Sequence, residues 1–192
     1  DAPRIASMSC SGGEASLMAD IAHGSDVTFP PLTQDQRDVL RETLGPIVTL
    51  SNPLDYHTFI WGDETAMATT FAAMLSDQVA LGVVVLDFPR QDRCKSPDWD
   101  RALRAVAHAQ KTSGRPIAVL SSLVENMPEA VAHQLVSQGV LPLCGMPEAV
   151  EAIEVAARVG KQTICNVLIP PQITASTVLS EVRAKQALTQ HG

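Results

Sequence analysis

Short apolar runs alternate along this sequence with stretches in which apolar residues recur every three or four positions. The clearest run is L-G-V-V-V-L at residues 81–86, whose β-branched residues are typical of a central strand covered on both faces of a parallel sheet. Because such runs alternate with helical patterns, the sequence predicts a doubly wound α/β domain. Five strands are expected, near residues 4–8, 27–29, 82–87, 116–120 and 140–143.

Capping residues mark several of the predicted helix ends. Thr33 and Gln36 form a capping-box pattern, and the helix that they open should stop at Gly45. Pro97 stands in the first turn of another expected helix, where its missing N–H costs nothing. Further helices are expected after residue 13 and near residues 64–75, 126–139 and 147–160. The stretch 51–63 is rich in turn formers, so we expect it to be irregular.

Right-handed crossovers between parallel strands then predict the strand order 2-1-3-4-5, which is a flavodoxin-like arrangement. In that order a crevice lies at the carboxyl ends of strands one and three. The turn at residues 9–14 and the segment at residues 87–90 should therefore face one another.

The turn after the first strand contains Ser11, Gly12 and Gly13. Without a Cβ, a glycine backbone can approach a ligand closely, and the first N–H groups of the following helix point outward with partial positive charge. These features are typical of an anion site. The turn matches neither G-x-G-x-x-G nor G-x-x-x-x-G-K-[ST], so no dinucleotide or P-loop nucleotide is indicated. A tight turn without a ligand is the alternative.

Composition narrows the class of protein. The 192 residues carry a formal net charge of −7, which argues against a nucleic-acid or anionic-membrane surface. No apolar run approaches the ~20 residues of a membrane-spanning helix. The four cysteines lack C-x-x-C spacing, so we expect neither zinc nor disulfides, and a reducing cytoplasm fits. We expect no metal site in this chain.

The two ends of the chain lead us to expect a piece of a longer polypeptide. It begins at Asp1 without an initiator Met and ends within a helical pattern. We expect one domain at residues 1–160. Residues 161–192 should form an aperiodic linker, followed by the start of a truncated next domain.

Three stretches, in order, resemble the nucleoside-diphosphate-forming acyl-CoA synthetases, relatives of succinyl-CoA synthetase. Residues 9–20, S-C-S-G-G-E-A-S-L-M-A-D, resemble T-N-A-G-G-P-G-V-L-A-T-D, and residues 51–55, S-N-P-L-D, resemble x-N-P-V-D. Residues 179–192, L-S-E-V-R-A-K-Q-A-L-T-Q-H-G, are similar to L-S-E-x-E-A-K-x-L-L-x-x-x-G, which opens the ATP-grasp part. The resemblance implies a flavodoxin-like CoA-ligase domain just before an ATP-grasp domain.

The resemblance also implies an activity for the full enzyme. Such a ligase joins a carboxylic acid to CoA with a nucleoside triphosphate, through an acyl phosphate and a phosphohistidine. ATP, CoA and magnesium are the implied cofactors of the full enzyme, and none is expected on this chain alone. The implied partners are the CoA-binding, phosphohistidine and ATP-grasp domains. A homo-oligomer is compatible with the resemblance. Neither nucleic acid nor a membrane is expected as a partner.

In the family this domain points a helix N-terminus at the phosphohistidine, which implies phosphate contact by Ser11, Gly12 and Gly13. His57 does not match the phosphohistidine motif, so we expect no catalytic residue in this chain and an inactive isolated protein. Glu14 stands where the family has Pro. The expected supporting residues around the turn are Asn52, Asp55 and Asp87.

Two other functions fit the sequence. The first is a non-catalytic flavodoxin-like module that binds a partner domain or a small anion for regulation, and Glu14 favours it. The second is a small serine hydrolase built on Ser11, because S-C-S-G-G resembles the G-x-S-x-G nucleophile elbow.

Overall fold

The computed structural model describes residues 3–90, 92–160 and 178–191. The chain divides at residue 161 into two compact units, each of which is described by itself. The described part of the second unit contains one helix, α7 (Glu181–His191). The predicted linker falls largely on residues outside the described ranges.

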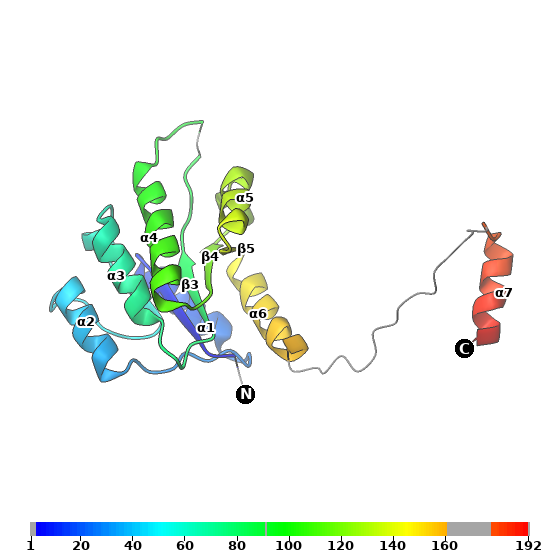
Figure 1. The fold of residues 1–192 in the computed structure, drawn as a ribbon, viewed down its shortest axis with the longest axis horizontal. Helices are drawn as coiled ribbons and strands as arrows, with labels where there is room; N and C mark the ends of the chain where they lie inside the picture. The colour runs from blue at the N-terminus through cyan, green and yellow to red at the C-terminus, as the bar shows by residue number, and fades with distance from the viewer. Residues whose placement is uncertain (1–2, 91, 161–177, 192) are drawn as a thin grey trace. The chain divides into compact units, whose positions relative to one another are not determined.

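The first unit is built on a parallel five-stranded sheet in the order β2-β1-β3-β4-β5 (Figure 1). This order confirms the predicted flavodoxin-like α/β fold. The central strand β3 pairs in parallel with β1 and β4, as the β-branched run at residues 81–86 indicated. The strands are β1 (Ile5–Ser9), β2 (Leu54–Asp55), β3 (Leu81–Val85), β4 (Ile117–Ser121) and β5 (Leu141–Cys144).

Helices cover both faces of the sheet. One buried cluster joins the strands to α1 and α6, and a larger one joins them to α2, α3, α4 and α5. Two 3₁₀ turns, η1 (Thr58–Ile60) and η2 (Val124–Asn126), lie in the connections. The helices are α1 (Gly12–Ala22), α2 (Gln34–Leu44), α3 (Glu64–Met74), α4 (Pro97–Ser113), α5 (Glu129–Ser137) and α6 (Met146–Gly160).

The prediction for the second strand was wrong in position. Residues 27–29 form no strand, and only Thr28 makes an isolated parallel bridge, to Arg4. The second strand is β2, within the stretch that we expected to be irregular, and it is two residues long. The Asn52 side chain extends its pairing with β1 by accepting from the N–H of Ser7 at 3.1 Å and donating to the carbonyl of Ile5 at 2.9 Å. The Asn52 side chain makes bonds that a longer strand would make through its backbone. The sequence therefore shows no alternating apolar pattern at this strand.

The capping predictions are confirmed. The Thr33 hydroxyl accepts from the N–H of Gln36 at 3.3 Å, and the Gln36 side chain accepts from the N–H of Thr33 at 2.9 Å. Pro97 is the first residue of α4. These caps fix the starts of α2 and α4, two helices that pack with α3 in the larger buried cluster.

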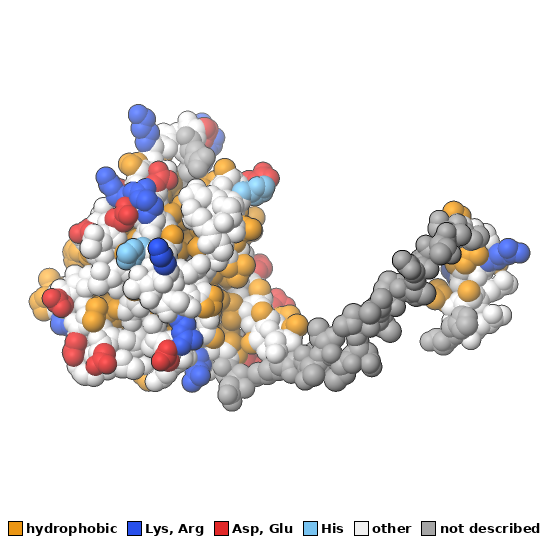
Figure 2. Space-filling model, viewed as in Figure 1, with side chains coloured by type: hydrophobic (Ala, Val, Ile, Leu, Met, Phe, Trp, Pro, Cys, Tyr) orange, Lys and Arg blue, Asp and Glu red, His pale blue; other side chains and the backbone are white. Residues whose placement is uncertain are grey.

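The surface of the first unit is mixed in charge, and Figure 2 shows acidic and basic side chains interspersed over the visible face. Within the described ranges, no helix has the length and apolar character needed to cross a bilayer. Among the same residues no three His, Cys, Asp or Glu side chains gather as metal ligands would.

Candidate functional site

The turn between β1 and α1 lies at the carboxyl edge of the sheet, beside the end of β2. The hydroxyl of Ser9 donates to the carbonyl of Ser11 at 2.9 Å and stiffens the turn. Ser11 is the N-cap residue of α1, but its side chain caps no backbone N–H. The first amides of α1 are therefore not engaged by their own cap, and both Gly12 and Gly13 are exposed.

Asp55 lies against the start of α1. A Cβ at Gly12 would stand 3.1 Å from its Oδ2, whereas a Cβ at Gly13 would meet nothing closer than the Ser11 hydroxyl at 3.5 Å. Gly12 is therefore the more constrained of the two glycines. A carboxylate in this position is favoured by the partial positive charge of the helix N-terminus.

His57 is held by the same carboxylate in an unusual backbone conformation. Its φ of 57° lies in the left-handed region, which non-glycine residues rarely adopt. Its N–H donates to Asp55 Oδ1 at 2.9 Å, and its Nδ1 lies 3.7 Å from Asp55 Oδ2. Backbone strain of this kind tends to occur at functional sites, and the sequence carried no signal for it.

Asn52, another of the predicted supporting residues, is engaged with the backbone. Besides its two bonds to β1, its amide donates to the carbonyl of Pro30 at 3.1 Å. These bonds fix the entry to β2 and so hold Asp55 at the helix. Gly12, Asn52, Asp55 and His57 together line a hollow of about 460 Å³ on one side of the turn.

A second hollow, of about 260 Å³, lies on the other side of the turn. We call it the tryptophan pocket. Trp61 and Trp99 meet there edge to face, with ring centroids 5.1 Å apart. The sequence prediction did not single out either tryptophan, because they come from a loop and from α4, 38 positions apart (99 − 61). The pocket is lined by Cys10, Glu14, Thr58, Trp61, Val85, Leu86, Asp87 and Trp99.

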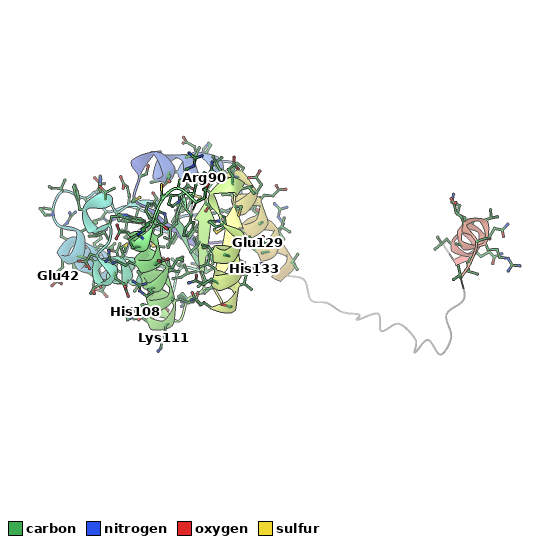
Figure 3. All side chains as sticks on the ribbon, turned by 90° about the horizontal axis from the view of Figure 1, so that it is seen from above. Glu42, Arg90, His108, Lys111, Glu129 and His133 are labelled. Carbon is green, nitrogen blue, oxygen red and sulfur yellow. The ribbon has the colours of Figure 1, made fainter. Side chains whose placement is uncertain are left out.

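Asp87, which follows β3, is fixed at the rim of the tryptophan pocket. Its carbonyl accepts from the indole Nε1 of Trp99 at 2.7 Å. Its carboxylate accepts from the N–H of Ser122 at 2.7 Å and from the Ser122 hydroxyl at 2.5 Å. The predicted approach of residues 9–14 to residues 87–90 is thus present, because Glu14 and Asp87 line one pocket. Arg90, labelled in Figure 3, donates from its guanidinium to the carboxylate of Asp92 at 2.6 and 3.0 Å.

Burial and like charge shift the pKa values of ionisable side chains around the turn. Desolvation, with the nearby charges of Asp87 and Asp55, raises the pKa of Glu14 to about 7, and its Oε2 is buried without a hydrogen-bond partner. Burial, followed by the charge of Glu14, raises the pKa of Cys10. A Glu with this pKa is partly protonated near neutrality, so it can either donate or accept a hydrogen bond.

Tyr56 adds a second unsatisfied oxygen. Its side chain is fully buried beside Phe71, and its hydroxyl has no hydrogen-bond partner. Burial raises the pKa of Tyr56 well above its usual value, and the charges of Cys10 and Glu14 raise it further.

Ser11 does not have the geometry of a hydrolase nucleophile. Its φ of −133° and ψ of 123° are ordinary extended values, not those of the strained elbow. Within the described part of the chain, no hydrogen bond joins its hydroxyl to a histidine. The structure therefore gives no support to the serine hydrolase hypothesis.

The sequence matches no established protein family and no curated protein. Solved structures do match it. The first unit is similar to PH0766 from Pyrococcus horikoshii OT3, with 18% identity and a TM-score of 0.63 over 82% of this chain and 36% of that one. It is also similar to dinucleotide forming acetyl-coenzyme A synthetase 1 from Ca. Korarchaeum cryptofilum, with 15% identity and a TM-score of 0.62 over 82% and 33% of the two chains.

The Korarchaeum enzyme is similar to the same extent in its complex with phosphate and ADP. The match thus spans about one third of the length of these proteins. At such identities the similarity establishes the fold. The fold is accordingly that of a flavodoxin-like region found within a larger acetyl-coenzyme A synthetase.

Proposed function

We propose that this chain is the domain of a nucleoside-diphosphate-forming acyl-CoA synthetase that presents the N-terminus of α1 to a phosphohistidine on another domain. The synthetase joins a carboxylic acid to CoA through an acyl phosphate. One observation carries the proposal: a glycine turn with an uncapped helix start lies at the carboxyl edge of a fold shared with part of an acetyl-coenzyme A synthetase.

The proposed phosphate contacts are the backbone N–H groups of Ser11, Gly12 and Gly13. A helix N-terminus stabilises a nearby anion by about 0.3–2 kcal/mol, enough to position a phosphoryl group but not to capture free phosphate tightly. Asp55 and Asp87 are occupied by their own hydrogen bonds. Glu14, partly protonated near neutral pH, opposes the phosphate less than an ordinary glutamate would.

ATP, CoA and magnesium belong, in this proposal, to other domains of the synthetase. The described residues offer no metal-ligand cluster that would fit magnesium. The Korarchaeum synthetase, whose chain is about three times as long as the matched region, was solved with phosphate and ADP. That complex supports phosphoryl chemistry in the larger assembly.

Activity assays test the proposal. The isolated chain, mixed with ATP, CoA and a panel of carboxylic acids, should form no acyl-CoA and no stable phosphoprotein. A longer polypeptide that adds the CoA-binding, phosphohistidine and ATP-grasp domains should form both. Histidine labelling of the isolated chain from ATP would contradict the proposal, and so would a longer polypeptide with no ligase activity towards any acid.

The second candidate is a non-catalytic module that binds a partner domain. Three carboxylates around the start of α1, those of Glu14, Asp55 and Asp87, favour it because they weaken an anion site. In that case, the longer polypeptide would retain full ligase activity when the Gly12–Gly13 turn is altered.

A further inference from the structure

The tryptophan pocket has the walls of a small-molecule site. Its base is apolar, from Val85 and Leu86, and one side is the edge-to-face pair of Trp61 and Trp99. Among the described residues that line it, none is Lys or Arg. The pocket adjoins the turn proposed for phosphate contact, but its lining does not include Gly12 or Gly13.

Three carboxylates, each on a separate element, make the charge around this pocket negative. Glu14 comes from α1, Asp55 from the end of β2 and Asp87 from the segment after β3, and the last two raise the pKa of the first. His57 lies beside Asp55, at 3.7 Å, and not in the pocket lining. The partial positive charge at the start of α1, about half a unit, offsets only part of this potential.

One lining residue of the pocket has a buried oxygen without a partner. It is Oε2 of Glu14, which can accept a hydrogen bond. Leaving buried polar atoms unsatisfied is costly, so such atoms next to a cavity call for a donor from a ligand. Tryptophan rings in turn attract cations that approach their faces.

We propose that the tryptophan pocket binds a small organic cation, the ammonium group of an alkylamine, beside the Trp61–Trp99 pair and against Glu14. The ammonium donates to the unpartnered Glu14 oxygen, and its carbon chain lies on Val85 and Leu86. A volume of about 260 Å³ suits a ligand of this size rather than a nucleotide. This inference concerns the chain itself and does not depend on the ligase activity.

Calorimetric titration of the 192-residue chain with propylammonium chloride tests the proposal, with 1-propanol as the uncharged match. We expect saturable binding of the amine with a Kd on the order of 1–10 mM, and none of the alcohol. Glu14→Gln should weaken binding at least about tenfold, as expected for loss of a buried charged partner. Glu42→Gln, an equivalent change of an exposed glutamate on α2 (Figure 3), should leave it unchanged.

The pH dependence gives a second readout that needs no variant. A cation binds the ionised form of Glu14, so affinity should rise between pH 6 and pH 8, and binding near pH 7 should release protons to the buffer. Absence of saturable binding, equal binding of propanol, or binding that survives Glu14→Gln would overturn the proposal. The proposal would also be overturned if a longer polypeptide no longer bound the amine. The pocket would then be assigned to a basic side chain of a neighbouring domain.

Discussion

At the scale of single residues, the surroundings of Glu14 disfavour its ionised form. Its folded-state pKa, about 7, exceeds the usual glutamate value of 4.5. The ionised form is therefore less stable in the folded than in the unfolded protein, and the free energy of unfolding should fall as pH rises from about 4.5 to 7. Below that range both states hold the proton, and the contribution vanishes.

Glu14→Gln should remove this dependence. Allowing for the half-exposed side chain, we expect the variant to be more stable than the parent by about 1–2 kcal/mol at pH 8 and nearly unchanged at pH 4.5. Urea denaturation at the two pH values measures the difference. An equal effect at both would show that the substitution acts through packing and not through charge.

His57 provides a test of backbone strain. Its φ of 57° costs a non-glycine residue about 1–3 kcal/mol, and glycine adopts it freely. Both His57→Ala and His57→Gly remove the side chain, so the difference between them isolates the backbone. We expect the glycine variant to be more stable by about 1 kcal/mol in thermal or urea unfolding. If the alanine variant proved as stable as the glycine variant, the strained conformation of residue 57 would be wrong.

The local pattern of strand, small-residue turn and helix predicted that Ser11, Gly12 and Gly13 lie at the sheet edge. The strand order placed Asp87 at the same edge. Asp55 was expected near the turn from its position in a polar loop, and not from the strand order. The role of the turn in phosphate contact stays a prediction. Trp61 and Trp99 could not be predicted as neighbours, because no periodicity links a loop to a helix that it meets only in the folded chain.

At the scale of elements, Asn52 joins the short edge strand β2 to β1. Removing its amide in Asn52→Ala leaves the buried N–H of Ser7 and the carbonyl of Ile5 without these partners. Unsatisfied buried groups cost about 1–3 kcal/mol each, so we expect a loss of about 2–4 kcal/mol in unfolding free energy. Ser51→Ala, which removes an exposed hydroxyl next to it, should cost less than about 0.5 kcal/mol. Similar losses for the two variants would contradict the bracing role of Asn52.

The helices were predictable because their caps and their apolar periodicity depend on residues close together in the sequence, such as Thr33 and Gln36. The strand β2 was not, since its two paired residues are fixed by contacts with β1. Residues 27–29 match the pattern of a short strand. In the structure, Thr28 makes a single bridge and Val27 is buried in the core. Short edge strands depend on tertiary contacts, and a local pattern does not reveal them.

At the scale of the whole molecule, the chain spans about one third of the length of the solved proteins that it resembles in fold. The predicted division into residues 1–160 and 161–192 stays a prediction about the longer protein. In the proposed function the chemistry is shared: other domains supply the nucleotide, CoA and histidine. This domain supplies a fixed helix terminus, so its contribution appears as a rate of phosphoryl transfer.

The most direct measurement is therefore single-turnover phosphoryl transfer, through the phosphohistidine, in the longer synthetase with Gly12→Val. The added side chain would press on Asp55, 3.1 Å from the position of its Cβ, and keep the phosphoryl group from the backbone N–H groups. We predict a rate about 10–30-fold lower, the equivalent of up to about 2 kcal/mol of lost stabilisation, with unchanged CoA affinity. Gly160→Val, where a Cβ meets nothing within 4 Å, is the matched control and should retain the parental rate. Full turnover by a folded Gly12→Val enzyme would contradict the phosphate role of this turn.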